Sequence, residues 1–347
     1  MKVWPRAHSP LRIFAISGLL TFTALCVVAS SMGLAALYVV LILIVVEITF
    51  SFDNAIINAK ILERLNPFWQ KLFLTLGIVI AIFGMRVLFP ILIVSLTSHL
   101  GWGRVVDLAL HHPTTYGHYL EVAHPMIAAF GGAFLLMLAF QFFFDDERDI
   151  LWMKRIERKM QRLSHWAWAP IMTSIILGFV SLLPINAHAR QTIVAGAFGT
   201  VSYVAIQLLV RWMEHLQKNE QSSSAQQFGV AALLTFVYLE ILDASFSFDG
   251  VIGAFAITND VVLIAIGLGV GALWVRSLTV YMVHKKALSE LIYLEHGAHY
   301  TVFVLAVVML ASALLRIPDI VPGLTGIGII GASIAASLRV RRLRASE

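Results

Sequence analysis

The sequence predicts an all-α polytopic membrane protein with about ten transmembrane helices, built from two inverted repeats. Three observations support this fold class. Hydrophobic residues make up 59% of the chain and charged residues only 13%, a balance far outside that of a soluble domain. Apolar windows long enough to cross a bilayer recur along the whole chain. One acidic motif, FSFD, ends two of these windows, at Phe50–Asp53 and again at Phe246–Asp249.

A transmembrane span needs roughly 20 apolar residues, because an α-helix rises about 1.5 Å per residue. The windows lie near residues 11–31, 33–53, 72–96, 126–144, 169–185, 191–211, 228–250, 261–283, 301–315 and 320–338. The first window follows Lys2, Arg6 and Arg12, which is also how a cleavable signal peptide begins. We expect this span to be retained, and cleavage is the alternative. The single cysteine, Cys26, excludes a disulfide framework and a cysteine metal cluster.

Lysine and arginine gather on alternate loops, and this predicts the orientation of the chain. With the N-terminus inside, 20 of the 25 lie in inside segments and three lie outside. The inside residues are three before residue 13, three in 60–71, six in 148–162, two in 211–218, two at 285–286 and four in 339–344. Cytoplasmic loops have the excess of these residues, so we expect both termini in the cytoplasm and the protein in the inner (plasma) membrane. The net charge of +5 then requires no nucleic-acid partner.

Two polar segments divide the chain. Asp145–Trp166 has apolar residues at helical spacing between charged ones, which predicts an amphipathic helix on the cytoplasmic membrane surface. Leu216–Gln227 is poor in apolar residues and predicts a flexible linker. The expected organisation is an N-terminal helix (1–32), a first repeat (33–144), the amphipathic segment (145–168), linking helices with the linker (169–227), a second repeat (228–340) and a basic tail (341–347).

The two halves of the chain match each other in order. The matched positions are Asp53 with Asp249, Glu47 with Asp243, Gly77–Arg86 with Gly267–Arg276, and Tyr119–His124 with Tyr293–His299. Three collinear regions of similarity indicate an internal duplication. The spans that end in FSFD are five crossings apart, so they run in opposite directions. The repeats are therefore inverted in the membrane, as in many secondary transporters.

Acidic residues lie in or at the ends of the two spans that contain FSFD. They are Glu47, Asp53, Glu240, Asp243, Asp249 and Asp260. An ionised group near the bilayer centre costs at least about 2.5 kcal/mol, and such residues mark ion or proton paths. The alternative is that they only pair with Arg86 and Arg276 and hold the spans together. Two arginines cannot neutralise five or six carboxylates, which favours an ion path.

The acids of one motif can face a single cation only if the helix breaks. Glu47 and Asp53 are six residues apart, which on a straight helix turns their side chains about 120° away from each other. Asn54, Gly250 and Gly253 are residues that tolerate a break, and the carbonyls freed around Ser51 and Ser247 would then become ligands. We therefore predict broken helices at both FSFD motifs.

The predicted cation site takes ligands from both repeats. Its members are Glu47, Asp53, Asn54, Asp243 and Asp249, with Ser51, Ser247, Glu240, Arg86 and Arg276 as secondary residues. Glu240 shares a helix face with Asp243 and is a candidate for an indirect contact or a proton relay. Oxygen ligands favour magnesium, calcium or manganese over zinc or copper. We predict a divalent metal ion as transported substrate, and no bound cofactor.

Two further groups of polar residues lie outside this site. Glu121 and Glu295 are equivalent by the repeat and begin matching spans, so they are candidate gate residues. Histidines gather in the predicted outside loop, at His99, His111, His112, His118 and His124. Their spacing matches no recognised zinc pattern, which favours a solvated interfacial loop over the alternative, capture of a softer metal.

The motif ExxxSxDN, formed by Glu47, Ser51, Asp53 and Asn54, together with LEILDASFSFDGVIGAFAITND in the second half, resembles the TerC family of integral membrane proteins. The similarity covers roughly residues 33–340 and is greatest to a branch known only as a domain of unknown function, related to the LysE-type transporter superfamily. The resemblance implies a metal-ion exporter, most often for manganese, with the motif acids as the ion site. Some relatives are associated with tellurite resistance. Gly250 stands where the first half has Asn54, so the two half-sites cannot coordinate identically.

Other functions compete with metal export. An enzyme is not expected, because the chain contains neither HExxH nor a GxSG-type nucleophile motif. The first alternative is a membrane scaffold or resistance-complex component, acting in tellurite or metal stress without transport of its own. The second is an organic-solute exporter. The expected partners are the lipid bilayer and a divalent metal ion, and the sequence leaves the oligomeric state open.

Overall fold

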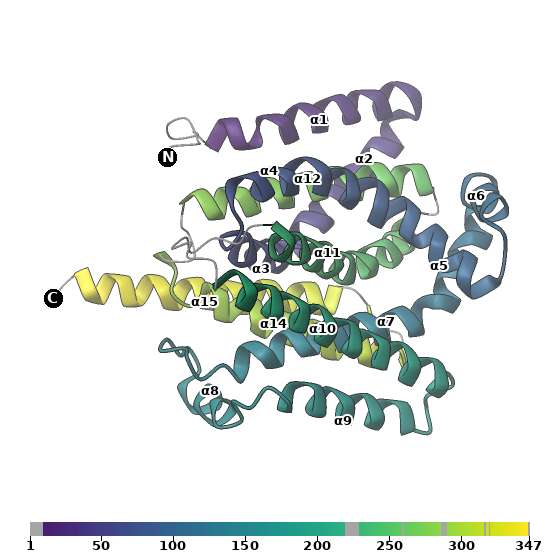
Figure 1. Ribbon diagram of the computed structural model, residues 1–347. Coiled ribbons are helices and arrows are strands. Elements are labelled where there is room, and N and C mark those ends of the chain that lie inside the picture. Colours follow the sequence, from purple (N-terminus) through teal and green to yellow (C-terminus); the bar gives the residue numbers. More distant parts are fainter. Residues whose placement is uncertain are drawn as a thin grey trace. The chain divides into compact units, whose positions relative to one another are not determined.

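The computed structural model describes residues 10–218, 229–258, 260–285, 290–315, 317–318 and 320–345. Every regular element in these residues is a helix (Figure 1), which confirms the all-α prediction. The elements are α1 (Pro10–Ser31), α2 (Gly33–Phe50), α3 (Phe52–Leu62), α4 (Pro67–Val79), the π-helix η1 (Ile80–Leu88), α5 (Phe89–Ser98), α6 (Trp102–His111), α7 (Pro113–Phe143), α8 (Lys154–Gln161), α9 (Trp168–Leu182), α10 (Ala189–Lys218), α11 (Gly229–Ile257), α12 (Val261–Lys285), α14 (Leu294–Ser312) and α15 (Ile320–Ala345).

The helices match the predicted spans. In the described part of the chain, nine helical segments are long and apolar enough to cross a membrane, and α9 is apolar but only 15 residues long. Each of the ten predicted windows coincides with one of the nine segments or with α9. The protein is thus a multi-pass helical membrane protein. Most of the predicted linker, residues 219–227, lies outside the described residues, as do the last two residues of the basic tail.

The chain divides into two compact units. Unit 1 contains Met1–Ala123 and Ser224–Lys285, and unit 2 contains His124–Ser223 and Lys286–Glu347. Each predicted repeat contributes its first part to unit 1 and its second part to unit 2.

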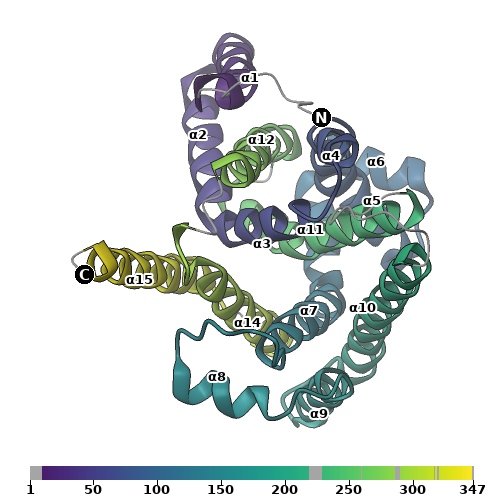
Figure 2. The ribbon, with the colours of Figure 1, turned by 60° about the vertical axis from the view of Figure 1, so that its left-hand side comes forward.

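In unit 1, α12 lies along α2, and α1, α3 and η1 also contact α12 (Figure 2). Glycines on α12 permit this close approach. A Cβ atom on Gly267 would lie 2.5 Å from Leu43 Cβ, and one on Gly271 would lie 2.5 Å from Glu47 Cβ. Both distances are far shorter than van der Waals contact, so larger residues would push the helices apart. Small residues of this kind are a common basis of helix packing in membranes.

The first FSFD motif contains a helix break, as predicted. Helix α2 ends at Phe50, α3 begins at Phe52, and Ser51 between them has φ −96° and ψ 14°. The chain changes direction here (Figure 2), although the backbone N–H of Ser51 still donates to Glu47 O at 3.0 Å. The break places Asp53 and Asn54 in the first turn of a new helix.

The prediction of a break at the second motif is wrong. Helix α11 continues through it from Gly229 to Ile257. The only glycines with positive φ in the described residues are Gly33 and Gly229, so Gly250 keeps a helical backbone. A glycine permits a break but does not require one, and here the helical hydrogen bonds continue.

Unit 2 contains two helix pairs, α14 with α15 and α9 with α10. Close contacts again involve glycine. A Cβ on Gly297 of α14 would lie 2.3 Å from Ser333 Oγ of α15. The Ser337 hydroxyl accepts a hydrogen bond of 2.9 Å from the backbone N–H of Tyr293. The start of α14 is therefore fixed against α15 by both packing and hydrogen bonding.

The predicted amphipathic segment is helical only in α8. The buried side chain of this helix is a carboxylate, not an apolar group. Glu157 is 0% exposed, whereas Ile156 beside it is 50% exposed. Glu157 accepts hydrogen bonds from the backbone N–H groups of Trp152 and Met153, at 3.2 and 3.0 Å, and from the Tyr300 hydroxyl of α14 at 3.1 Å. A carboxylate therefore ties this segment to α14. Its place at the membrane surface stays a prediction.

His296 and Arg148 complete the cluster around Glu157. His296 Nε2 lies 2.8 Å from the Ile150 carbonyl and 3.4 Å from Glu157 Oε2, so this nitrogen bears the proton and donates. Burial would raise the pKa of Glu157, but hydrogen bonds from His296 and from the Met153 N–H hold that pKa below its ordinary value. Burial lowers the pKa of Arg148. The cluster is thus most stable with the carboxylate ionised.

Candidate ion site

Unit 1 buries the acidic residues of both repeats. Glu47 is in the last turn of α2, Asp53 and Asn54 are in the first turn of α3, and Asp243 is in α11. These four residues are between 2% and 6% exposed. Because α12 contacts both α2 and α11, and η1 contacts α11, the acids of the two repeats lie inside one compact unit.

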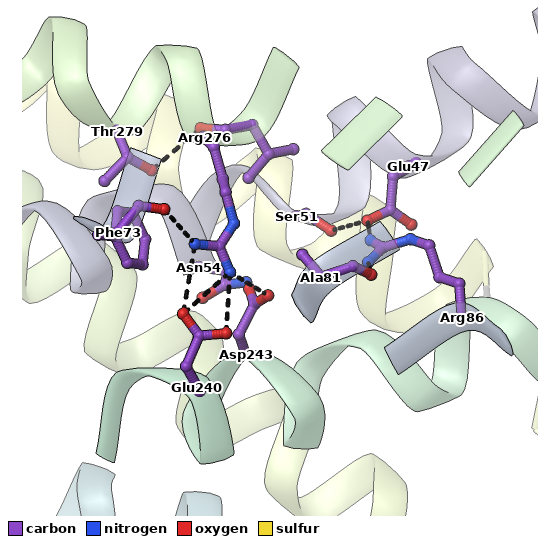
Figure 3. Close-up of polar contacts among 11 residues, drawn as sticks. Glu47, Ser51, Asn54, Phe73, Ala81, Arg86, Glu240, Asp243, Arg276 and Thr279 are labelled. Carbon is purple, nitrogen blue, oxygen red and sulfur yellow. Dashed lines mark hydrogen bonds and ion pairs between the residues drawn. The ribbon is translucent and has the colours of Figure 1, made fainter. Parts of the chain in front are cut away.

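Glu47 pairs with an arginine of its own repeat. Arg86 Nη2 lies 2.5 Å from Glu47 Oε1, and the Ser51 hydroxyl donates to the same oxygen at 3.1 Å (Figure 3). Arg86 Nη1 donates to the Ala81 carbonyl at 2.6 Å. Arg86 lies in η1, whose π-helical turns are frequent at functional sites.

Arg276 of α12 has the corresponding role in the second repeat. Its Nη2 lies 3.1 Å from Asp243 Oδ2 and 3.2 Å from Glu240 Oε2 (Figure 3). Its Nη1 donates to the Phe73 carbonyl at 3.0 Å, and the guanidinium lies over the Phe73 ring at 4.2 Å. Gly77 leaves the space for this group, since a Cβ there would be 2.3 Å from Arg276 Nη1.

The two ion pairs are equivalent by the repeat. The sequence alignment matches Glu47 to Asp243 and Arg86 to Arg276, and the structure joins each acid to the arginine of its own half. These contacts were not used to align the two halves, so they are independent support for the internal duplication.

A hydrogen bond between side chains also links the two predicted repeats. Asn54 Nδ2 donates to Asp243 Oδ1 at 2.7 Å (Figure 3). The orientation of the amide is chemically required, because the opposite one would turn its oxygen toward a carboxylate. Asn54 Oδ1 is then left buried, without a hydrogen-bond partner. Gly250 occupies the equivalent position in the second repeat, and a Cβ there would lie 3.3 Å from Glu47 Oε2.

The structure does not gather the predicted ligands around one point. Figure 3 shows two groups, Glu47 with Ser51 and Arg86, and Asp243 with Glu240, Asn54 and Arg276. Within the described residues, no three His, Cys, Asp or Glu side chains form a group that could hold a metal ion. The side chains of Ser247 and Asp249 are outside the described residues, and their roles stay predictions.

The remaining candidates lie elsewhere. Glu121 is exposed on α7 within unit 1, and Glu295 is partly buried in the first turn of α14 in unit 2. Their gating role stays a prediction. Among the loop histidines, His111 Nδ1 contacts Asp107 at 2.9 Å, with both side chains exposed.

Sequence reasoning missed Asn58. It lies one turn after Asn54 on α3, is 1% exposed, and its Oδ1 is also buried without a partner. The signal was available as an i, i+4 pair of asparagines, which places both amides on one helix face. Two buried amide oxygens without donors are unusual in a native structure and require an explanation, such as a water or an ion.

The fold is that of a multi-pass helical membrane protein, and its unit 1 buries acidic residues from both predicted repeats. The family described as "Protein of unknown function (DUF475)" matches residues 52–344, and the chain belongs to this family. The description names neither TerC nor the LysE superfamily, so that resemblance stays a prediction. No curated protein and no solved structure matches the chain.

Proposed function

We propose that the protein is a transporter of divalent metal ions, with manganese as the cargo and export as the direction. The observation that supports this most directly is the burial in unit 1 of acids from both repeats. Glu47 and Asp53 come from the first, and Glu240 and Asp243 from the second, all exposed by 6% or less. Burying a charged group is costly unless an opposite charge or a metal compensates it.

The charges of these residues do not balance. When ionised, the four carboxylates have four negative charges, whereas Arg86 and Arg276, which pair with Glu47, Glu240 and Asp243, have two positive charges. The excess of two negative charges equals the charge of one divalent cation. The amide oxygen of Asn54 adds a neutral oxygen ligand. Such ligands suit manganese, magnesium or calcium rather than zinc or copper.

Manganese and the outward direction are drawn from the TerC resemblance of the two motifs. The orientation is drawn from the loop charges, which favour both termini in the cytoplasm. Inverted repeats that meet at a buried site with a broken helix are frequent in secondary transporters, and the break at Ser51 fits this pattern.

Reconstitution into liposomes tests the proposal. Mn²⁺ added outside should enter protein-containing vesicles, measured by quenching of a trapped chelating dye, and should not enter empty vesicles. Asp53→Asn should abolish the flux while the protein still inserts, because the change keeps the size and removes a negative ligand. Asp107→Asn is the matched control, since Asp107 pairs with Arg104 on an exposed helix face, and its flux should equal that of the wild type.

Cellular manganese tests the direction. Under manganese load, overexpression should lower the cell content measured by elemental analysis, and deletion should raise it. If the purified protein moves no divalent metal while its deletion still causes metal or tellurite sensitivity, the scaffold alternative is correct. Flux of an organic solute but not of metal would favour the alternative of an organic-solute exporter.

A further inference from the structure

We propose that Arg86 and Arg276 are the resident counter-ions of the ion site. They hold its carboxylates when no cargo is bound, and an incoming divalent cation displaces them. This inference rests on the proposed function, because it describes how the same acids exchange one positive partner for another.

Both arginines occupy the position that a cation would need. Arg86 and Arg276 are 4% and 3% exposed, and each binds a carboxylate predicted to ligate the metal. While they stay in place, Glu47, Glu240 and Asp243 are held in ion pairs, and no three described His, Cys, Asp or Glu side chains form a group that could hold a metal. Withdrawal of Arg276 would free Asp243 and Glu240 beside the unpartnered oxygen of Asn54.

Neither guanidinium group has all of its hydrogen-bond donors satisfied. A buried ion pair offsets its desolvation only when the remaining hydrogen-bonding groups are also satisfied. The Nε atoms of Arg86 and Arg276 are both buried without a hydrogen-bond partner. The contacts of Arg276 with Glu240 and Asp243 measure 3.1–3.4 Å, longer than the 2.7–2.9 Å usual for charge-assisted bonds.

The two arginines differ in how tightly they are held. Arg86 has the short contact of 2.5 Å to Glu47, whereas Arg276 divides its guanidinium between two acids at longer distances. We therefore expect the cation to displace Arg276 first. Arg86 has a route for later movement, because conversion of one π-helical turn of η1 to α-helix would rotate its side chain by about 100°.

Gly77 offers a way to displace Arg276 without removing its charge. A methyl group at this position would lie 2.3 Å from Arg276 Nη1 and 2.7 Å from Glu240 Oε1. Gly77→Ala should therefore push the guanidinium away from its acids. Gly18→Ala on α1 is the matched control, since a Cβ there meets nothing within 4 Å.

The experiment is a titration of purified protein with Mn²⁺ by calorimetry, with thermal unfolding and liposome flux measured on the same variants. Arg276→Gln and Gly77→Ala should bind Mn²⁺ about 5-fold to 10-fold more tightly than the wild type, a coupling of ordinary size, and should transport it more slowly because release is impaired. Arg104→Gln, at an exposed arginine, and Gly18→Ala should match the wild type.

The outcomes separate the two proposals. If the wild type binds no divalent metal, the proposed function fails and this inference fails with it. If the wild type binds Mn²⁺ but Arg276→Gln and Gly77→Ala, with normal unfolding temperatures, bind it equally or more weakly, the arginines are structural and only this inference is overturned. Where Arg276→Gln loses its fold, Gly77→Ala decides, and Arg86→Gln applies the same test to the equivalent pair.

Discussion

Asn54 and Asp243 are 189 positions apart, and a hydrogen bond of 2.7 Å joins them inside unit 1. This contact connects the broken helix of the first repeat to the continuous helix of the second. The Asn54 amide, together with the contacts of Arg276 to Phe73, thus joins the two groups of polar residues.

Asn54→Ala should destabilise the protein by about 1.5–3 kcal/mol, the usual contribution of a hydrogen bond to a charged group. Asn58→Ala is the comparison, because Asn58 is equally buried but its Oδ1 has no partner to lose. We expect Asn58→Ala to cost less, since removing an unsatisfied polar group relieves a desolvation penalty. Thermal unfolding of both variants in detergent measures the difference, and equal losses would contradict this account of the pair.

Gly271→Ala should separate α2 from α12. Its methyl group would lie 2.5 Å from Glu47 Cβ and 2.6 Å from Glu47 Cγ, and overpacking of this kind costs about 1–3 kcal/mol. The measurement is the unfolding midpoint in detergent, together with Mn²⁺ flux. Gly18→Ala on α1, where a Cβ meets nothing within 4 Å, should leave both unchanged. An unaltered midpoint for Gly271→Ala would show that the two helices have room to adjust.

Protonation of Glu157 at acid pH should loosen the segment that contains α8. Its pKa is lower in the folded protein than the ordinary value of 4.5, so its contribution to stability is fully present above about pH 4.5 and is lost as the pH falls through the lowered value. Hydrogen exchange at the Trp152 and Met153 amides, which both donate to this carboxylate, should accelerate over that interval after correction for intrinsic exchange.

Glu157→Gln should remove this pH dependence and loosen the segment already at neutral pH, because the ionised acceptor is lost. The control is Glu147→Gln, at an exposed position of the same segment. Wild-type behaviour of Glu157→Gln in hydrogen exchange would mean that other contacts hold the segment to α14.

Cysteine labelling tests the predicted orientation of the chain in the membrane. In a Cys26→Ala background, Thr114→Cys should react with an impermeant maleimide added to intact cells, and Glu147→Cys should react only after permeabilisation. Both positions are exposed, so accessibility depends on the side of the membrane alone. The reverse labelling pattern would overturn the orientation drawn from the loop charges.

The amino-acid sequence alone was sufficient to predict the spans and the break at Ser51, and it indicated the duplication. Spans depend on the apolar content of about 20 neighbouring residues, which is a local property. The duplication is visible because the two halves kept matching residues in the same order, and the structure gives equivalent partners to Glu47 and Asp243. The family match over residues 52–344 agrees with the fold class.

Tertiary structure decided which groups meet. Arg86 and Glu47 are 39 positions apart, and only the packing of η1 against the rest of unit 1 brings them together. The helix continues through the second motif and Gly250. A glycine is compatible with both a continuous and a broken helix, so the residue type alone could not predict which one forms. Likewise, no local pattern separates Glu157 from the charged residues around it, since its burial follows from hydrogen-bond donors that α14 and the preceding loop provide. The desolvation of a buried charge has to be offset by groups within hydrogen-bonding distance. Those groups are often distant in the chain, so only the tertiary structure shows which of them pair.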